Sequence, residues 1–563
     1  MYVFAIIKSV DKIIPFSEVF IMFKRIVSLL LCAVIIALFC SCGKSSSDVL
    51  IMPISADPLC LDPQVADSKE AKLIINNCYE GLVRLDADGK IIPGVAETWD
   101  VSADGLTYTF HLRSDSHWKL LNSFEDVLPE GYKDSYRTQV IAADFVFGLR
   151  RAVDPITQSN DAEKLFCIKN AADINSGKQS VSSLGVQAQD DQTLVVTLQR
   201  ADPDFLRKLT MPVSMPCHEE FFNATHAKYG LDLKYTFCNG PFYLSRWAED
   251  NTLSAYKNDE YKGNAQVRPD EIYFYVNTDE TSVIKKLKQR TYDCAFVSES
   301  ALDSFADNSK ITEQSINNIV YGLCLNCQDS VLMNEDMRKA LVMVTKTDKL
   351  TESSANAFTS GIVPQCVRFG EQSYRDLAGS ASGLGYNETQ AVALWKKGLK
   401  ALDISTAEIT VTCTEENAAL MQEAIQNWQK VLGTSILAKV EIKSADDVRT
   451  SIANSTYQIA YYRINTDSST VTDTLKKFTS DSSYNIFNFS DKEYDAAVNA
   501  VLKTYSCDNI VSGCVKAEQI ILNKAVFVPM FYGSSYAVIN KDVDGLYFSS
   551  AFESVCMISG GHS

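Results

Sequence analysis

Residues 61–113 are the most informative part of this sequence, reading LDP at 61–63, NCYEGL at 77–82, PGVAETW at 93–99 and DGLTYTFHLR at 104–113. The last segment starts with the turn dipeptide DG and continues as LTYTFHL, in which apolar and polar residues alternate. Such alternation is typical of a strand with one buried face. The pattern therefore predicts a strand over residues 106–112 that is entered through a turn.

The rest of the chain mixes strand-like and helix-like patterns. Residues 193–198 alternate like the first strand, and the strand-like residues 409–412 and 439–442 flank a helical pattern over residues 418–432. This mixture indicates an α/β or α+β architecture. With 563 residues, of which 46% are hydrophobic and 22% charged, the chain is long enough for large hydrophobic cores. We expect about two to four domains.

The chain is acidic, with a formal net charge of −17 at pH 7. An acidic surface repels the phosphates of nucleic acid and the headgroups of anionic lipid. The composition therefore argues against a nucleic-acid partner and against electrostatic docking on a membrane. Any link to the membrane is expected to be a covalent lipid.

The N-terminal region has the layout of a secretory signal. An apolar run over residues 26–39 follows Lys24 and Arg25 and leads into a polar Gly-Lys-Ser tract. The run is shorter than the about 18 consecutive apolar residues that a membrane-spanning helix needs. We therefore predict a signal segment and not a permanent span. The alternative is a short uncleaved anchor.

The residues FCSC that end this run resemble a bacterial lipobox, in which a small residue precedes the cysteine that receives the lipid. Ser41 is the small residue and Cys42 the predicted lipidation site. The signal segment would then cover residues 1–41, of which residues 1–21 are interpreted as an extension from a misplaced start. Residues 42–48 would form the tether.

The sequence shows no catalytic constellation. Its five histidines form no His-Glu-x-x-His motif, and neither a Gly-x-Ser-x-Gly elbow nor a Gly-rich phosphate loop occurs. Ser282 and Lys285 have the spacing of serine acyl-enzymes, but they stand in a charged amphipathic pattern without companion motifs. We expect a protein that holds a ligand without transforming it, with no enzyme activity, no cofactor and no metal.

The order of the motifs resembles that of the extracellular solute-binding family of oligopeptide and dipeptide ABC importers. Besides the segments of residues 61–113, the resemblance rests on AADFV, RAVDP, NGPFYL, MRKAL and VPMFY, at residues 142–146, 151–155, 239–244, 337–341 and 528–532. It covers nearly the whole chain after the signal segment.

The resemblance implies an α/β fold of the two-lobed, periplasmic-binding-protein-like kind, class II and of the three-domain oligopeptide-binding type, with a hinge between the lobes. Two crossing strands would form that hinge, and closure would bury a ligand. The implied first lobe combines residues 49–92, 218–318 and 533–563 and carries an extra domain over residues 93–217. The implied second lobe covers residues 319–532.

The resemblance also implies ligand-binding residues in the second lobe. An aspartate that pairs with the α-ammonium group of a bound peptide corresponds, without gaps, to Asp467. Arg463, Ile464 and Asn465 stand where the family has Gly-Trp-Cys, so this chain adds a cation and lacks a flat apolar wall. The added arginine would fill space, pair with a ligand carboxylate or point outward. The alternative for Asp467 is a solvated turn residue.

The opposite wall is implied to consist of Asp67, Ser68 and Lys69, for which the alternative is a polar helix start. Tyr532 stands where the family places cleft tyrosines, although an aromatic residue in an apolar strand is often core. An insertion over residues 119–139, longer than the usual loop, is expected at the cleft rim or elsewhere on the surface.

The sequence thus predicts a lipid-anchored, extracytoplasmic, monomeric solute-binding protein. It would capture a peptide ligand by recognising its extended main chain at strand edges, and deliver it to the permease subunits of an ABC transporter in the membrane. Two alternatives remain on the same fold: binding of another solute, such as a nickel chelate, a sugar or a signalling peptide, and a sensory or adhesion role. An exported hydrolase is disfavoured because catalytic motifs are missing.

Overall fold

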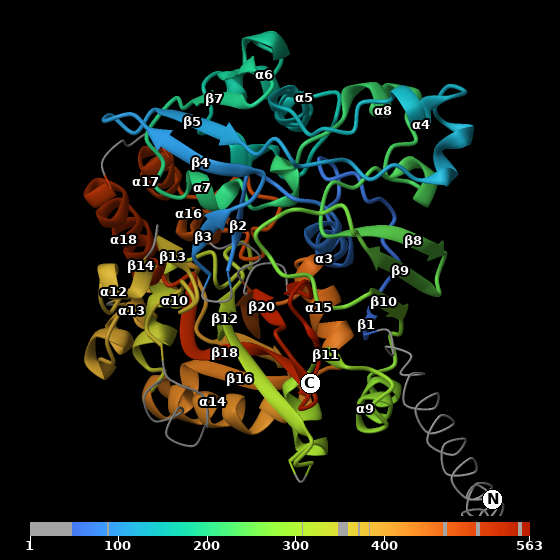
Figure 1. The fold of residues 1–563 in the computed structure, drawn as a ribbon. Coiled ribbons are helices and arrows are strands. Elements are labelled where there is room, and N and C mark those ends of the chain that lie inside the picture. Colours follow the sequence, from blue (N-terminus) through green and yellow to red (C-terminus); the bar gives the residue numbers. More distant parts are fainter. Residues whose placement is uncertain are drawn as a thin grey trace, which may run out of the picture. The chain divides into compact units, whose positions relative to one another are not determined.

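In the computed structural model, the motifs of residues 61–113 form helix α3 (Lys69–Cys78) and strands β2 (Val83–Leu85), β3 (Ile91–Pro93), β4 (Ala96–Val101) and β5 (Thr107–Leu112) (Figure 1). In β5, buried and more accessible side chains alternate. The predicted strand over residues 106–112 is therefore confirmed.

The structure describes residues 48–86, 89–306, 308–346, 359–369, 372–381, 383–465, 470–502, 507–549 and 554–563. Residues 49–563 form one unit, and the following description concerns that unit alone. The predicted signal segment, Cys42 and most of the predicted tether lie outside the described residues, as does Asp467.

Two four-stranded sheets are built from the first half of the chain and belong to one core cluster. In the first, β1 (Val49–Ile54) lies parallel to β10 (Glu271–Val276), and the order is β1-β10-β9-β8. The second has the order β4-β5-β7-β6, and helix α5 packs on β6 and β7. The remaining elements of these two layers are β9 (Thr252–Lys257), β8 (Phe242–Ala248), β7 (Thr193–Thr197), β6 (Val186–Asp190) and α5 (Ala142–Val153).

A six-stranded sheet with the order β11-β18-β12-β17-β15-β16 organises the second half of the chain. Its strands are β11 (Cys294–Val297), β18 (Phe527–Asn540), β12 (Ile311–Leu325), β17 (Ile459–Asn465), β15 (Ala407–Cys413) and β16 (Ile436–Ile442). Helix α14 (Ala418–Leu432) connects β15 to β16, which run parallel. The predicted strand–helix–strand pattern over residues 409–442 is thereby confirmed.

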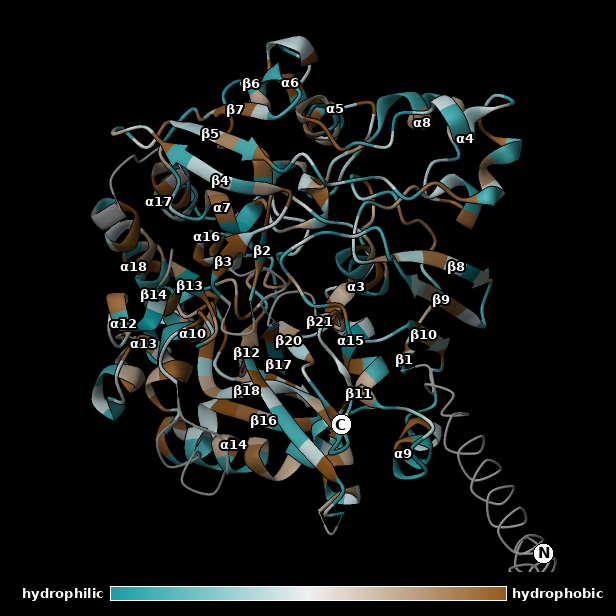
Figure 2. Cartoon of the chain, viewed as in Figure 1, coloured by the Kyte–Doolittle hydropathy of each residue, from teal (hydrophilic) through white to brown (hydrophobic). Residues whose placement is uncertain are grey.

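Helices cover both faces of this mixed sheet. Hydrophobic residues lie on the strands and on helix α14 (Figure 2). One face packs against α10 (Glu335–Met343), α13 (Glu388–Ala401) and α14, with Trp395 and Trp428 buried between them. The other face packs against α15 (Ala445–Ala453), α16 (Val471–Lys476), α17 (Lys492–Leu502) and α18 (Cys507–Asn523).

The two longest strands of the sheet, β12 and β18, pair in antiparallel register. Their register shifts twice, between Ile316 and Ile319 and between Tyr321 and Gly322. The domain boundaries expected at residues 318/319 and 532/533 fall inside these strands, beside the first shift. The division of the chain into lobes remains a prediction.

Part of the insertion over residues 119–139 packs against an aromatic cluster around His218. Tyr136 stacks on His218 with the ring centroids 5.1 Å apart, and Trp118 meets the same imidazole edge-on. Tyr132 is buried and donates a hydrogen bond of 2.6 Å to the carbonyl of Leu121. Tyr132 of the insertion is therefore part of the protein interior, and Tyr136 is half-buried against the aromatic cluster.

Shorter elements complete the fold. They are η1 (Asn122–Asp126), α4 (Tyr132–Ser135), η2 (Ala162–Leu165), α6 (Ala171–Asn175), η3 (Val181–Ser183), α7 (Phe205–Lys208), η4 (Pro212–Ser214), α8 (Glu219–Ala224), η5 (Leu233–Tyr235), α9 (Glu280–Lys288), η6 (Glu299–Ser304), β13 (Arg368–Phe369), β14 (Gln372–Ser373), α12 (Tyr374–Ala378), η7 (Glu415–Asn417), η8 (Gly433–Ser435), β19 (Val543–Asp544), β20 (Tyr547–Ser549), β21 (Ser554–Cys556) and β22 (Gly561–His562).

Candidate ligand-binding site

The predicted residues of the second lobe lie at the end of strand β17. Ile464 is buried in the cluster of helices α15–α18, whereas Arg463 is exposed and lies opposite Tyr321, its register partner on β12. Successive strand residues point to opposite faces. The cation that replaces the family's glycine is therefore directed toward Tyr321, on the face opposite Ile464.

Asn465 and Thr470 are the described residues nearest Asp467 in the sequence, one on each side. The carbonyl of Asn465 accepts a hydrogen bond of 2.7 Å from Lys477. Thr470 caps helix α16 by accepting from the amide of Asp473 at 3.3 Å and by donating to its carboxylate at 2.6 Å. These two residues therefore bond to α16 or to the residue just after it.

The predicted opposite wall is the start of helix α3. Ser68 caps the helix by accepting from the amide of Ala71 at 3.1 Å, and Asp67 is exposed and accepts from the side chain of Asn160 at 3.1 Å. Lys69 is exposed and lines a pocket together with Ser55 and Phe296. The Ser68 hydroxyl is thus committed to the helix, while Asp67 and Lys69 face outward.

A short segment around helix η2 connects the two predicted walls. On one side it contacts α3, through Asn160 with Asp67 and through Asp161 with Lys72 at 2.7 Å. On the other side it contacts α16, through the ion pair of Lys164 with Asp473 at 2.9 Å. A second ion pair, between Glu163 and Lys476 at 3.3 Å, accompanies it. The segment around η2 therefore contacts both predicted walls.

The Lys164–Asp473 pair is the more buried of the two contacts with α16, because its side chains are 13% and 10% exposed, against 45% and 23% for Glu163 and Lys476. Burial alone would raise the pKa of the Asp473 carboxyl, but Lys164 and Lys476 outweigh burial and hold this pKa well below its usual range. Sequence inspection missed these residues, since no local pattern distinguishes them from ordinary helix charges.

Tyr532 lies on β18 opposite Val320 and is half-buried. It packs against the same hydrophobic cluster as Ile464. The structure therefore places Tyr532 and Ile464 on one face of the six-stranded sheet, near helix α16.

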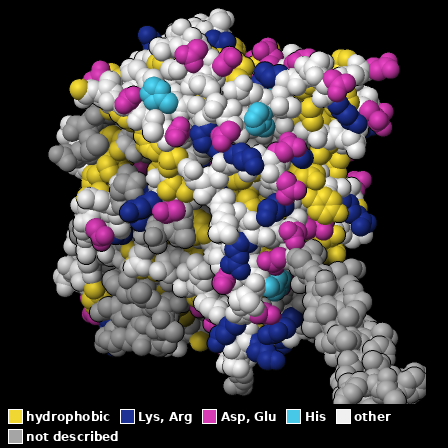
Figure 3. All heavy atoms as spheres, in the orientation of Figure 1, with side chains coloured by type: hydrophobic (Ala, Val, Ile, Leu, Met, Phe, Trp, Pro, Cys, Tyr) yellow, Lys and Arg dark blue, Asp and Glu magenta, His cyan; other side chains and the backbone are white. Residues whose placement is uncertain are grey.

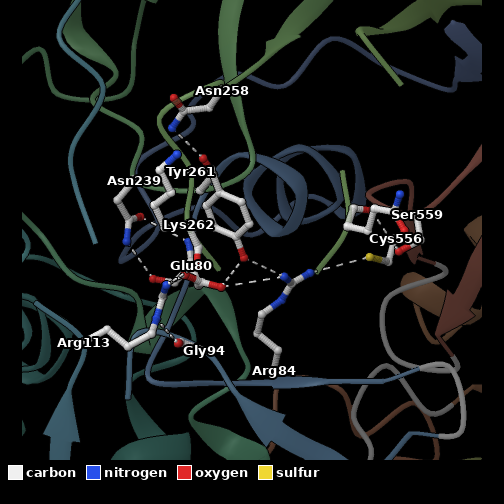
Figure 4. Close-up of polar contacts among 12 residues, drawn as sticks. Glu80, Arg84, Gly94, Arg113, Asn239, Asn258, Tyr261, Lys262, Cys556 and Ser559 are labelled. Atoms are coloured by element: carbon white, nitrogen blue, oxygen red, sulfur yellow. Dashed lines mark hydrogen bonds and ion pairs between the residues drawn. The ribbon is translucent and has the colours of Figure 1, made fainter. Parts of the chain in front are cut away.

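The motifs that carry the family resemblance meet elsewhere, at a buried cluster of polar side chains that we call the Glu80 joint (Figure 4). The Glu80 carboxylate pairs with Arg113 at 2.8 Å and with Arg84 at 3.7 Å, and it accepts a hydrogen bond from Tyr261. The side chain of Asn239 exchanges hydrogen bonds of 3.1 and 2.8 Å with the backbone of Glu80.

Other contacts join further motifs in the same part of the molecule. Arg113 also donates to the carbonyl of Gly94 at 3.0 Å. Arg151 forms a two-pronged pair with Asp62, with distances of 2.6 and 3.1 Å, and its guanidinium lies 3.9 Å from the centroid of the Phe222 ring. Such bidentate pairs fix geometry strongly. The motifs of residues 61–155 and 239–244 therefore specify the framework of the fold.

Within the described part of the chain, no group of three or more His, Cys, Asp and Glu side chains is arranged to hold a metal ion. Among the same residues, no helix has the length and apolar character needed to cross a membrane.

Comparisons with known proteins define the family. Residues 90–485 match the model of the bacterial extracellular solute-binding proteins, family 5, and the chain belongs to this family. A dipeptide-binding protein of Bacillus subtilis is 24% identical over 515 residues, covering 89% of this chain and 90% of its own. A probable deoxycholate-binding periplasmic protein of Escherichia coli is 26% identical and covers 87% and 89%.

The fold is also found in solved structures. The peptide-bound OppA of Listeria monocytogenes superposes with a TM-score of 0.70 at 24% identity, over 92% of this chain and 99% of its own. The expected two-lobed, periplasmic-binding-protein-like α/β fold is thereby confirmed. The family consists of extracellular solute-binding proteins, which agrees with the predicted extracytoplasmic class.

Proposed function

We propose that this protein is the lipid-anchored solute-binding component of an ABC importer, which captures peptides by closure of its lobes and delivers them to a membrane permease. It acts as a monomer without catalytic activity. Membership of the solute-binding family and similarity to a protein named as dipeptide-binding support the class of ligand. The predicted lipid at Cys42 would keep the protein at the cell surface.

The observation that carries the proposal is the hydrogen bonding of Asn465 to Lys477 and of Thr470 to Asp473, because these are the described residues nearest Asp467 in the sequence on either side. A carboxylate at Asp467 would pair with the α-ammonium group of a peptide through a charge-assisted hydrogen bond.

Main-chain recognition would supply the remaining affinity. An extended peptide satisfies its amides at a strand edge without regard to side chains, so many sequences are accepted. We place the hinge at the register shift of β12 and β18 next to Ile319, because a bulge interrupts the hydrogen-bonded ladder and allows the strands to bend. Asp67 and Lys69 would meet the ligand from the opposite lobe.

The substitution Asp467→Asn tests the amine partner. We expect it to weaken binding of a free-amine peptide by about 1.5–3 kcal/mol, the range for hydrogen bonds to charged groups, and to leave an N-acetylated peptide nearly unaffected. Isothermal titration calorimetry with both peptides measures this difference. Asp403→Asn, at an exposed position beyond α13, is the matched control. An equal loss for both peptides would remove Asp467 from this role.

A second candidate function is binding of a non-peptide solute, which the similarity to a probable deoxycholate-binding protein favours. Mass spectrometry of ligands released from the purified protein separates the two. A mixed set of short peptides supports the proposal, and a single steroid, sugar or metal chelate refutes it.

Labelling with palmitate tests the anchor independently. We expect the label to disappear in Cys42→Ala, and a label that persists would show that another residue carries the lipid.

A further inference from the structure

Basic residues gather at one end of the folded unit, although the chain as a whole is acidic. Four of them, Lys285, Lys286, Lys288 and Arg290, belong to the C-terminal half of helix α9 and the residues just after it. Lys310 precedes β12 and Lys541 follows β18. We call these six residues the α9 basic surface. Figure 3 shows Lys and Arg side chains grouped at the lower end of the molecule.

The contacts between these elements make the surface continuous. Arg290 pairs with Asp542 at 3.1 Å, and the amide of Lys541 donates to the carbonyl of Lys310 at 2.9 Å. The ammonium group of Lys288 lies 5.6 Å from the centroid of the Phe305 ring. Beneath the surface, Val283 and Leu287 of α9 share one hydrophobic cluster with Phe305, Ile311 and Val538.

Most of this positive charge is uncompensated. Lys285, Lys288, Lys310 and Lys541 are exposed, and none of them forms an ion pair with a residue that the structure describes. Lys286 donates a neutral hydrogen bond of 3.0 Å to the hydroxyl of Tyr292. A favourable interaction with the helix dipole accounts for lysines at the end of α9. It does not account for Lys310 and Lys541, which come from other elements.

The chain enters the folded unit beside this surface. Strand β1 starts at Val49, and Ile51 packs against the cluster that contains Val283 and Leu287 of α9. If Cys42 carries a lipid, the predicted tether of residues 42–48 spans at most about 25 Å when fully extended. The anchor therefore holds the end of the molecule that bears α9 near the lipid.

We propose that the α9 basic surface docks the anchored protein on the anionic phospholipid headgroups of its membrane. This inference rests on the proposed lipid anchor. The overall charge of −17 opposes docking weakly, because physiological salt screens charges beyond about 8 Å. Within that distance the four exposed lysines attract anionic headgroups, and each basic residue near an anionic surface strengthens binding about fivefold. The overall composition argues against docking on anionic lipid, but it averages over an uneven distribution of charge on the surface.

Sedimentation with vesicles tests the proposal. The exported chain carrying Cys42→Ala, and hence no lipid, is mixed with phosphatidylcholine vesicles that contain or lack phosphatidylglycerol. We expect binding only to the anionic vesicles, and a decrease when salt is raised. In the variant Lys285→Glu/Lys288→Glu/Lys310→Glu we expect the partition coefficient to fall at least tenfold.

The matched control is Lys396→Glu/Lys400→Glu/Lys430→Glu, which changes the net charge equally on exposed positions of α13 and α14. It should bind like the parent chain. Equal losses in both variants, or equal binding to neutral and anionic vesicles, would overturn the proposal. Binding to a soluble polyanion without binding to vesicles would also overturn it, in favour of a cell-wall polymer. Calorimetry with peptide on the same variants reports the proposed transport function separately.

Discussion

The Glu80 joint and the candidate site between α3, η2 and α16 use charge in different ways. In the joint, Glu80 is 1% exposed and its carboxylate is surrounded by Arg113, Arg84 and Tyr261. At the site, Asp67 and Arg463 are exposed, and the described ion pairs are partly open to solvent. The joint is thus a buried charge cluster, whereas the site keeps exposed charged side chains.

This difference explains why the sequence indicates the family more clearly than it indicates the ligand. The resemblance rests on residues such as Glu80, Arg113 and Asn239, which hold the framework together and contact one another. The residues expected to meet the ligand, such as Arg463 and Ile464, depart from the family pattern. A buried charge that loses its partner is costly, so framework residues tolerate few substitutes.

The largest expected effect is on the joint. Glu80→Gln should lower the free energy of unfolding by about 3–5 kcal/mol, because the guanidinium of Arg113 stays buried and loses its buried counter-charge, keeping only the exposed Asp115. Urea denaturation measures this loss. Peptide affinity of the folded fraction should not change. Arg449→Gln, in the exposed pair with Asp446, is the control and should cost less than about 0.5 kcal/mol. A loss below 1 kcal/mol in Glu80→Gln would remove the contrast between the two regions.

The next effect concerns His218, which belongs to the buried framework as well. Burial, followed by the nearby Arg137, lowers the pKa of this imidazole from 6.5 to about 4. The unfolded chain therefore binds a proton before the folded chain does, so the contribution of His218 to stability is complete above pH 6.5 and is lost as the pH falls toward 4.

We expect the stability of the parent chain, relative to His218→Gln, to drop by about 3 kcal/mol between pH 7 and pH 4. Denaturation curves at a series of pH values check this slope. A relative stability that does not vary with pH would show that the imidazole titrates normally in the folded protein.

The smallest effects are expected at the candidate site. A double-mutant cycle of Lys164→Met and Asp473→Asn should give a coupling of about 1–2 kcal/mol in the free energy of unfolding. Part of this coupling should also appear in the free energy of peptide binding, because the pair connects regions assigned to different lobes. The matched cycle of Glu163→Gln and Lys476→Gln, in the more exposed pair, should give less than about 0.5 kcal/mol. Equal couplings would mean that burial does not distinguish the two pairs.

Local patterns predicted local structure well. The alternation of residues 106–112 and the helical period of residues 418–432 each reappear as β5 and α14, since one buried face determines such a pattern. Which strands share a sheet could not be predicted, as for β1 beside β10. Such pairing depends on the whole hydrophobic core and produces no local pattern in the sequence.

The site was predicted less completely than the fold. The family resemblance supplied Asp67 and Asp467 as opposite walls, and the structure shows that the first contacts the η2 segment. The ion pair of Glu163 with Lys476 joins residues 313 positions apart, and neither residue has an unusual neighbour in the sequence. Long-range ion pairs of this kind become visible only when the chain is folded.

The pairing of β12 with β18 has a consequence for the thermal unfolding of the protein. Each strand runs through both proposed lobes, so the six-stranded sheet is shared between them. Melting of one lobe would strip hydrogen bonds from the other, and heating should therefore produce a single calorimetric transition whose midpoint rises with ligand concentration.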